Sequence, residues 1–220
     1  MTTEPNSPPR SQRGAARGQY AKSAQRRREI LAAALEVFAC AGYHNGSLRT
    51  VAQRCGLPET TVLHHFPSKK LLLEALLDDQ EQSAREVAEP HADLFGALEA
   101  VLATSDEHSA RFAELMNRLS VEATDPDHPA HEHLVRRSRR LQAALTDGFA
   151  DIGETGRLRA GLSPSTAAAL VLAAWGGLQS GHLLDPDAPD VPDTTTGLRT
   201  LLSAFVIDEP REKENNHAVD

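Results

Sequence analysis

The sequence has few cysteines and few aromatic residues. Cys40 and Cys55 are the only cysteines among 220 residues, too few for a disulfide framework, so we expect two reduced thiols in the protein core. Aromatic residues make up 4% of the chain. Strands favour aromatic and β-branched residues, whereas alanine and leucine, which are abundant here, favour helices. The composition therefore predicts an all-α fold.

Long apolar runs are also lacking. The longest candidate, residues 167–178, is shorter than the roughly 20 residues that a membrane span needs, and it contains two glycines. The N-terminal arginines are followed by no apolar run before Ile30, so the sequence predicts no secretory signal. We therefore expect a cytoplasmic protein that does not contact a membrane.

Catalytic motifs are absent too. The sequence contains no GxSxG, no HExxH, no glycine-rich phosphate loop and no convincing pair of carboxylates. We expect no enzyme, no catalytic residue and no cofactor. His131 and His133 are two residues apart and diverge on a helix, so with His128 they predict a solvated helix start rather than a metal site. A basic cluster follows, which we expect to form a solvated face paired with acidic side chains: Arg136, Arg137, Arg139 and Arg140.

Charge is divided unequally along the chain. The net charge of −8 alone argues against a nucleic-acid partner. Residues 1–72, however, contain 11 basic and 4 acidic residues, a net charge of +7, whereas the remainder contains 12 and 27, a net charge of −15. A basic head on an acidic body indicates one surface suited to a polyanion.

Apolar periodicity and helix-ending residues locate the first helix. Ile30, Ala34 and Phe38 recur every four residues and predict a helix over 23–40 that Gly42 ends. The preceding residues 1–22 are rich in Pro, Ser, Gly, Gln and Arg, and we expect a disordered basic arm there. The arm either adds phosphate contacts or has no function.

Two short helices should follow. Ser47 can cap a helix that ends at Gly56, and Pro58 suits the first turn of a third helix that ends near His65. Two such helices joined at a glycine match a helix-turn-helix unit, placed in a domain over residues 23–72. A helical body is expected over 73–208, followed by a disordered tail at 209–220. Further helices are predicted at about 69–87, 92–104, 107–123, 130–152, 164–184 and 194–207.

Residues 28–73 resemble the DNA-binding domain of the TetR/AcrR family. The matching landmarks keep their order and spacing without a gap: Ile30, Leu31, Ala34, Phe38, Gly42, Tyr43, Ser47, Val51, Ala52, Gly56, Leu57, Thr61, His65, Phe66, Ser68, Lys69 and Leu72. The resemblance implies an N-terminal helix-turn-helix and a helical ligand-binding and dimerisation body. It also implies a homodimer that represses transcription from a (pseudo)palindromic operator and is released by a small molecule.

Polar residues on the two short helices are the candidate DNA contacts, because polar side chains there can reach base edges or phosphates. They are Ser47, Arg49, Thr60, Thr61, His64, His65 and Lys69. Lys69 stands in the first turn of the next helix, where a cation opposes the helix dipole, so we expect it to contact a phosphate.

The chain departs from the family pattern at several positions of this unit. Leu63 replaces a usual Tyr, Pro58 a usual Ser or Thr, and Lys70 a usual acid. Leu63 either packs in the core, which we favour, or contacts a thymine methyl group. Glu59 would repel phosphate but can accept a hydrogen bond from a cytosine amine.

The body carries an apolar helix at 167–179, which must be buried on most sides. The resemblance implies that it pairs with the last helix in a dimeric four-helix bundle. The expected interface residues are Leu170, Ala174, Gly177, Leu178, Leu201 and Phe205. Candidate ligand-binding residues are Met116, Trp175 and Gln179, and Trp175 is alternatively core or interface.

Two other functions remain open at this stage. The first is an activator or architectural DNA-binding protein without a ligand, and the second is a cargo-binding helical bundle that does not touch DNA. For the favoured repressor, a mostly apolar pocket implies a lipophilic inducer.

Overall fold

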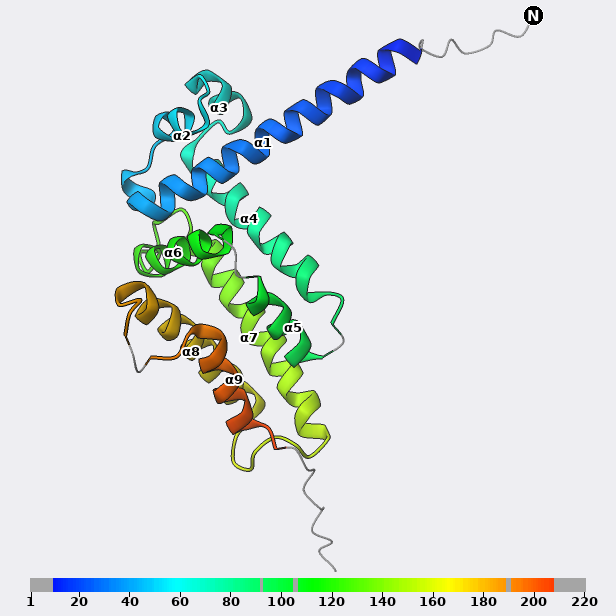
Figure 1. The fold of residues 1–220 in the computed structure, drawn as a ribbon, viewed down its shortest axis with the longest axis vertical. Coiled ribbons are helices and arrows are strands. Elements are labelled where there is room, and N and C mark those ends of the chain that lie inside the picture. The colour runs from blue at the N-terminus through cyan, green and yellow to red at the C-terminus, as the bar shows by residue number, and fades with distance from the viewer. Residues whose placement is uncertain (1–9, 92, 105–106, 189–190, 208–220) are drawn as a thin grey trace, which may run out of the picture. The chain divides into compact units, whose positions relative to one another are not determined.

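The computed structural model describes residues 10–91, 93–104, 107–188 and 191–207 (Figure 1). These residues form nine helices and an isolated β-bridge between Leu158 and Val206. The all-α prediction is confirmed. The chain divides into two compact units with a boundary between Leu76 and Leu77. The expected tail at 209–220 lies outside the described residues.

The first helix, α1 (Arg10–Asn45), begins earlier than expected. Residues 10–22 were expected to lack regular structure because they lack apolar periodicity. Arginine, glutamine and alanine nevertheless favour helix, so they can extend a helix that the core anchors further along. Gly42, the residue expected to end the helix, has φ 75° and ψ 171° and interrupts it. A left-handed φ is tolerated there because glycine has no Cβ.

The predicted helix-turn-helix is present as α2 (Leu48–Cys55) and α3 (Glu59–His65). The side chain of Ser47 caps α2 by accepting a hydrogen bond from the backbone N–H of Thr50 at 3.0 Å. Gly56 ends α2 with φ 65°. The short turn from Gly56 to Pro58 fixes the angle between the two helices, and hence the direction in which α3 presents its side chains.

The core of the first unit joins α1 to the helix-turn-helix. Phe38, Val51, Val62 and Phe66 are almost completely buried, whereas Leu57 is only partly buried. Gly46 packs so closely on Phe38 that a Cβ there would lie 2.6 Å from its ring. The end of α1 is thus held against the start of α2.

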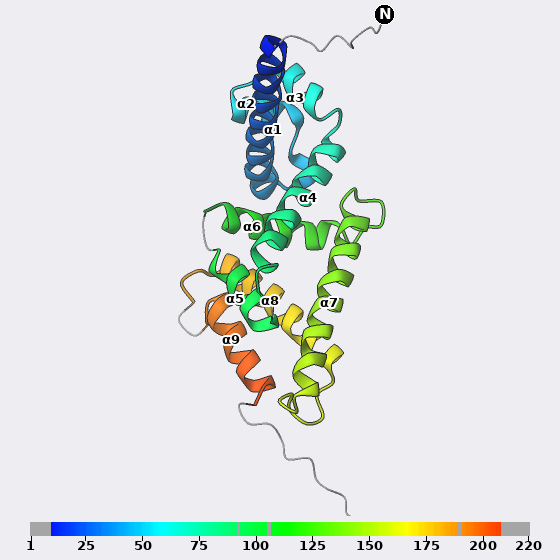
Figure 2. The same ribbon diagram turned by 90° about the vertical axis from the view of Figure 1, so that its right-hand side faces the viewer.

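The other six helices lie in the second unit, except that the N-terminal part of α4 belongs to the first unit. They are α4 (Lys69–Ala88), α5 (Leu94–Ala103), α6 (Glu107–Glu122), α7 (His131–Glu154), α8 (Pro164–Leu184) and α9 (Thr194–Phe205). All match the predicted elements within a few residues. Figures 1 and 2 show α6 running across the direction of α7. The main contacts of the unit are α7 with α8 and α8 with α9.

The core of the second unit lies between these long helices. Phe149 of α7 and Phe205 of α9 pack edge to face, with ring centroids 6.3 Å apart. Leu198 and Leu202 of α9 are buried beside them. Phe205 was predicted as a dimer contact, but it is 9% exposed and fills the core of its own chain. Helical spacing alone does not separate the two faces of α9, since both carry apolar residues.

Helix α8 is apolar but little buried. By length and composition it is long and apolar enough to cross a membrane, whereas the sequence predicted no such segment. One such helix is weak evidence for a membrane span, because core helices of soluble proteins pass the same test. Little of α8 is buried within the single chain, and Leu170 is 45% exposed.

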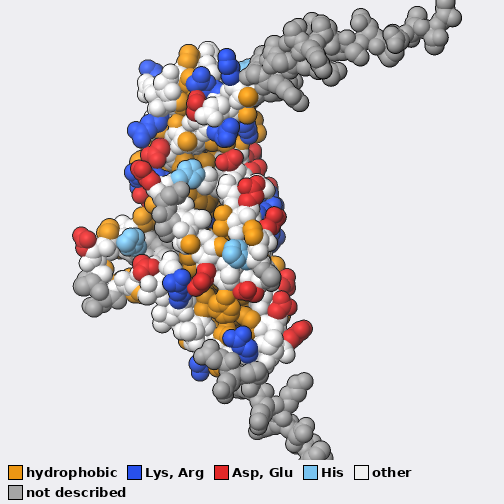
Figure 3. All heavy atoms as spheres, turned by 45° about the vertical axis from the view of Figure 1, so that its right-hand side comes forward, with side chains coloured by type: hydrophobic (Ala, Val, Ile, Leu, Met, Phe, Trp, Pro, Cys, Tyr) orange, Lys and Arg blue, Asp and Glu red, His pale blue; other side chains and the backbone are white. Residues whose placement is uncertain are grey.

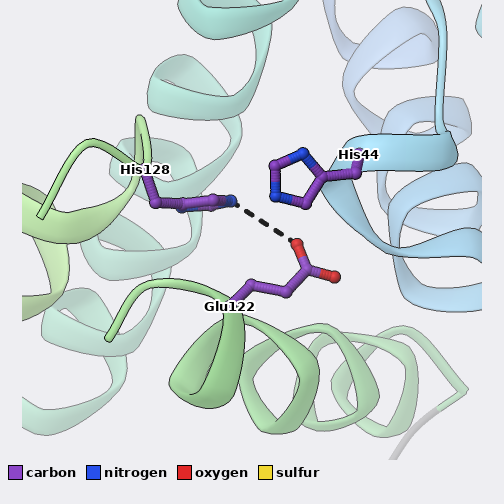
Figure 4. A group of neighbouring side chains, drawn as sticks. All are labelled: His44, Glu122 and His128. Atoms are coloured by element: carbon purple, nitrogen blue, oxygen red, sulfur yellow. Dashed lines mark ion pairs between the residues drawn. The ribbon is translucent and has the colours of Figure 1, made fainter. Parts of the chain in front are cut away.

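The histidines before and within α7 differ from the prediction of a solvated helix start. His128 is buried and its Nε2 lies 3.5 Å from Oε2 of Glu122. Figure 4 marks this pair with a dashed line and also draws His44, which belongs to the first unit. His131 Nδ1 lies 2.8 Å from the carbonyl of Ala123. His133 is buried against α4 instead. The rings of His128, His131 and His133 therefore contact three different sets of partners.

The cysteines differ from the prediction as well. Both are free thiols, but Cys40 is exposed rather than in the core. Cys55 is partly buried and donates its S–H to the carbonyl of Val51 at 2.9 Å. Burial raises the pKa of Cys55, which lowers the share of reactive thiolate at this residue.

Candidate nucleic-acid interface

The surface of α2 and α3 presents polar side chains that a duplex could contact. Arg49, Thr60 and His64 are exposed, whereas Thr61 and His65 are partly buried. Val62 and Phe66 anchor α3 from beneath. The rigid base and the exposed polar face are what a helix needs to enter the major groove and contact base edges.

Two of the predicted DNA contacts have structural partners within the chain. The Ser47 hydroxyl both caps α2 and lies 2.7 Å from the hydroxyl of Thr50. The ammonium group of Lys69 donates to the carbonyls of Tyr43, His44 and Gly46 at 2.7, 3.1 and 2.9 Å.

An ammonium group has three N–H donors, and Lys69 directs them to these three carbonyls. Its Nζ also lies 4.2 Å from the centre of the Tyr43 ring. Tyr43 and His44 lie in the last turn of α1 and Gly46 follows it, so the cation sits near the negative end of the helix dipole. The structure thus gives Lys69 a role in holding the turn before α2, and a phosphate contact would have to replace one of these bonds.

The end of α3 lies in a positive environment. Burial is the first cause that lowers the pKa of His65, followed by the charges of His64, Arg27 and Arg26. A neutral ring has one donor and one acceptor nitrogen, so His65 can take part in either kind of hydrogen bond at neutral pH. The rings of His64 and His65 are themselves 5.7 Å apart, edge to face.

Leu63 does not pack in the core, so the position that we favoured for it is wrong. Its side chain is 40% exposed, since α3 is a short helix whose buried face is already taken by Val62 and Phe66. The alternative, an apolar contact with a thymine methyl group, is therefore compatible with its position. Glu59 stands in the first turn of α3, where a negative charge favours the helix dipole.

Comparison with known proteins identifies the family of this fold. Residues 30–76 match the profile of the bacterial regulatory proteins, tetR family. The HTH-type transcriptional regulator UidR of Escherichia coli is 38% identical over 65 residues, which are 29% of this chain and 33% of UidR. The chain thus spans about a third of the length of the UidR relatives that it matches. The HTH-type transcriptional repressor Rv1474c of Mycobacterium tuberculosis is 32% identical over 139 residues, 62% of this chain and 71% of Rv1474c.

This chain belongs to the TetR family. Solved structures of the TetR fold agree with it over most of its length. Salmonella enterica GusR is 27% identical, with a TM-score of 0.62 over 81% of this chain and 94% of GusR. The SmeT–triclosan complex has a TM-score of 0.68 at 22% identity, over 85% of this chain and 99% of SmeT, a likeness in fold alone.

In this TetR-family chain, the predicted ligand-binding residues are all partly buried. Met116 lies on α6, and Trp175 and Gln179 lie on α8. The two helices contact each other, and the Ser180 hydroxyl donates to Oδ1 of Asn117 at 2.7 Å. Trp175 also packs against the core of the unit. The three residues therefore lie on neighbouring helices, with Trp175 serving partly as core.

The predicted dimer residues of the TetR-family chain fall into two groups. Leu170 and Gly177 lie on the exposed side of α8, whereas Ala174, Leu178 and Leu201 pack partly against their own core. A Cβ at Gly177 would meet no heavy atom within 4 Å. The chain itself therefore gives no reason for glycine at this position.

A buried charged cluster joins α4 to α7, which sequence analysis did not find. Glu81 and His133 have side chains 8% and 7% exposed, and Nε2 of His133 lies 3.0 Å from Oε1 of Glu81. Arg140 also pairs with Glu81, and burial lowers the pKa of Arg137 against the opposing effect of Glu81. Glu81 follows the buried Leu77 by one helical turn, so the two share a face of α4. A charged residue on this apolar face is the sequence signal that could have indicated the cluster.

Proposed function

We propose that this protein is a ligand-responsive transcriptional repressor that binds a (pseudo)palindromic operator as a dimer in the bacterial cytoplasm. The observation that carries the proposal is the exposed polar face of α3, held by a buried core in a helix-turn-helix. Within it, Thr60 and His64 are the foremost candidates for base contacts, because both are exposed.

The body is proposed to bind the inducer between α6 and α8, near Met116, Trp175 and Gln179. Because two of these side chains are apolar, the inducer should be small and lipophilic. Release follows if the ligand binds more tightly to a conformation whose recognition helices do not match the two half-sites. The relative Rv1474c is named a repressor, and SmeT forms a complex with triclosan, which supports both parts of the proposal.

Selection of duplexes from a random library tests base recognition. The unmodified chain should select a two-fold symmetric sequence with salt-dependent affinity. T60A and H64A should each relax the preference at particular positions by about 1–3 kcal/mol, whereas T200A, an exposed threonine of α9, should not.

The outcomes of this selection separate the candidate functions. Absence of any selected sequence and of salt-dependent binding would favour a helical cargo-binding protein. Binding that no small lipophilic molecule weakens would favour an activator or architectural protein. An unchanged consensus for both variants would move base recognition to Arg49, Thr61 or Leu63.

A further inference from the structure

The N-terminal part of α1 is a basic segment that the helix-turn-helix does not use. Between residues 5 and 28 the sequence contains no Asp or Glu. It contains seven basic residues: Arg10, Arg13, Arg17, Lys22, Arg26, Arg27 and Arg28. This one segment accounts for most of the positive charge of the first unit.

Helix α1 continues far beyond the core that anchors it. Every residue from 21 to 28 is exposed, and Ile30 is the first buried residue of the helix. From Arg10 to that point the helix is about 30 Å long at 1.5 Å per residue. Figure 1 shows this part of α1 extending past α3. We call residues 10–28 the basic arm.

The positions of charge in the basic arm suit one continuous partner. Arg10, Arg13 and Arg17 are three and four residues apart, so these positions share one face of the helix. The arm contains no Leu, Ile, Val, Met, Phe or Trp. A helix that lies in a membrane surface needs such residues on its other face, so the composition favours a polyanion in water over a lipid surface.

The base of the basic arm lies directly beside the recognition helix. The guanidinium carbon of Arg27 is 4.4 Å from the centre of the ring of Phe66, the residue that follows α3. The charges of Arg26 and Arg27 reach His65, where they contribute to its lowered pKa after burial and His64. Arg26 also pairs with Glu29 at 2.9 Å. The arm therefore leaves the unit at the surface that presents α3.

We propose that the basic arm binds the phosphate backbone of the duplex that α3 contacts, beyond the bases that α3 recognises. This inference rests on the proposed DNA-binding function. Each strand of duplex DNA carries a phosphate about every 3.4 Å along the duplex axis, so a helix of about 30 Å can pass several phosphates. Arginine at a phosphate releases counterions and carries no sequence information, so the arm adds affinity without changing the consensus.

The test neutralises the far end of the basic arm while keeping its helix. The arm variant combines R10Q, R13Q and R17Q, because glutamine favours helix about as well as arginine. The control variant combines R118Q, R136Q and R139Q, three exposed arginines of α6 and α7, and has the same net charge. Affinity is measured across a salt series for a random duplex of about 40 base pairs and for the duplex that the unmodified chain selects.

The arm variant should lose affinity for both duplexes, and its slope of log K against log [salt] should fall by about 2–3 per chain, since each lost phosphate contact removes about 0.9. The control variant should keep the slope of the unmodified chain. Equal slopes for the two variants would overturn the role of the arm while leaving the proposed DNA-binding function intact. A changed consensus for the arm variant would overturn the assignment to phosphates. Failure of the unmodified chain to bind either duplex would overturn the proposed function itself.

Discussion

Lys69 makes contacts in the structure that the sequence did not predict. From the sequence, a cation in the first turn of a helix, next to a helix-turn-helix, indicated a phosphate contact. The structure instead directs its ammonium group to three carbonyls at the end of α1. The sequence could not show this, because Tyr43, His44 and Gly46 approach Lys69 only after Gly42 has turned the chain.

Replacement of Lys69 tests this structural role. K69A should lower the free energy of unfolding by about 2 kcal/mol, because it removes the hydrogen bonds that a charged donor makes to the chain. K70A is the matched control, since Lys70 is exposed and its only described ion pair, with Glu74, spans 3.8 Å. Its effect should stay within about 0.5 kcal/mol.

Urea unfolding followed by circular dichroism measures both changes. Equal stability of K69A and K70A, with weaker binding of K69A to all duplexes, would return Lys69 to the phosphate contacts that the sequence suggested.

For the candidate DNA contacts, the sequence predicted which polar residues lie on α2 and α3, but not which of their side chains are exposed. Thr60 and Thr61 are chemically identical neighbours, yet only Thr60 is exposed because the helical rotation turns Thr61 toward the buried side of α3. Leu63 shows the same limit in reverse, since an apolar residue expected in the core lies largely in solvent. Such distinctions depend on how α3 is rotated about its axis, which core packing sets.

Apart from those of α1, the helix boundaries were predicted to within a few residues, because each depends on a local signal. At α9, the signal in the structure is the capping residue Asp193. Its Oδ1 accepts a hydrogen bond from the backbone N–H of Thr196 at 2.9 Å, and its Oδ2 accepts one from the Thr196 hydroxyl at 2.7 Å. The hydroxyl is the first cause that lowers the pKa of Asp193, and the backbone N–H is the second.

The lowered pKa of Asp193 predicts an acid-dependent loss of stability. Because the folded pKa lies below the unfolded one, the carboxylate stabilises the fold above the ordinary pKa of an aspartate. This contribution is lost as the pH falls through the lowered pKa. D193A should therefore be less stable than the unmodified chain at pH 7, and the difference should shrink in acid.

D193N is the control for charge, because it keeps an oxygen that can cap α9 but does not titrate. Unfolding followed across the acid range compares the three proteins. A difference between D193A and the unmodified chain that stays constant with pH would show that the ionised form of Asp193 does not stabilise α9.

Other elements were harder to predict, because their stability comes from distant partners. Residues 10–22 have no apolar periodicity, and helix propensity can extend α1 over them only because the rest of the helix is anchored. The cluster of Glu81, His133 and Arg140 forms between α4 and α7, separated by some 50 residues of sequence. No spacing within either helix indicates that pairing.

At the scale of the whole molecule, α8 presents an apolar surface that its own chain leaves open. Its exposed residues include a stripe of mostly small side chains: Thr166, Ala169, Leu170, Ala173, Gly176, Gly177 and Ser180. A second copy of α8 could approach such a stripe closely. We therefore propose the exposed part of α8, rather than Phe205, as the centre of the dimer interface.

Substitution of Gly177 separates this proposal from an effect on folding. The isolated chain has room for a side chain there, so G177L should leave the folded chain intact and even favour α8 by up to about 1 kcal/mol. The leucine should prevent close approach of a second α8, so the protein should sediment as a monomer. Operator affinity should then fall, because the two recognition helices are no longer linked.

G153L is the matched control, since Gly153 is an exposed helical glycine of α7 whose added Cβ would lie 3.8 Å from Leu158. It should sediment as the unmodified chain does. A G177L dimer with unchanged operator affinity would place the interface elsewhere and make the glycines of α8 better candidates for the floor of the ligand pocket beside Trp175.

Because little of α8 is buried within the single chain, the stability of the protein in the cell should depend on its concentration. When association covers a helix that the single chain leaves open, folding is linked to concentration, and the melting temperature rises as protein is added. A newly made chain without a partner would expose apolar surface and be open to proteolysis, whereas a paired chain would be protected. Its lifetime in the cell would then increase with its own abundance, setting a lower limit below which the regulator is cleared.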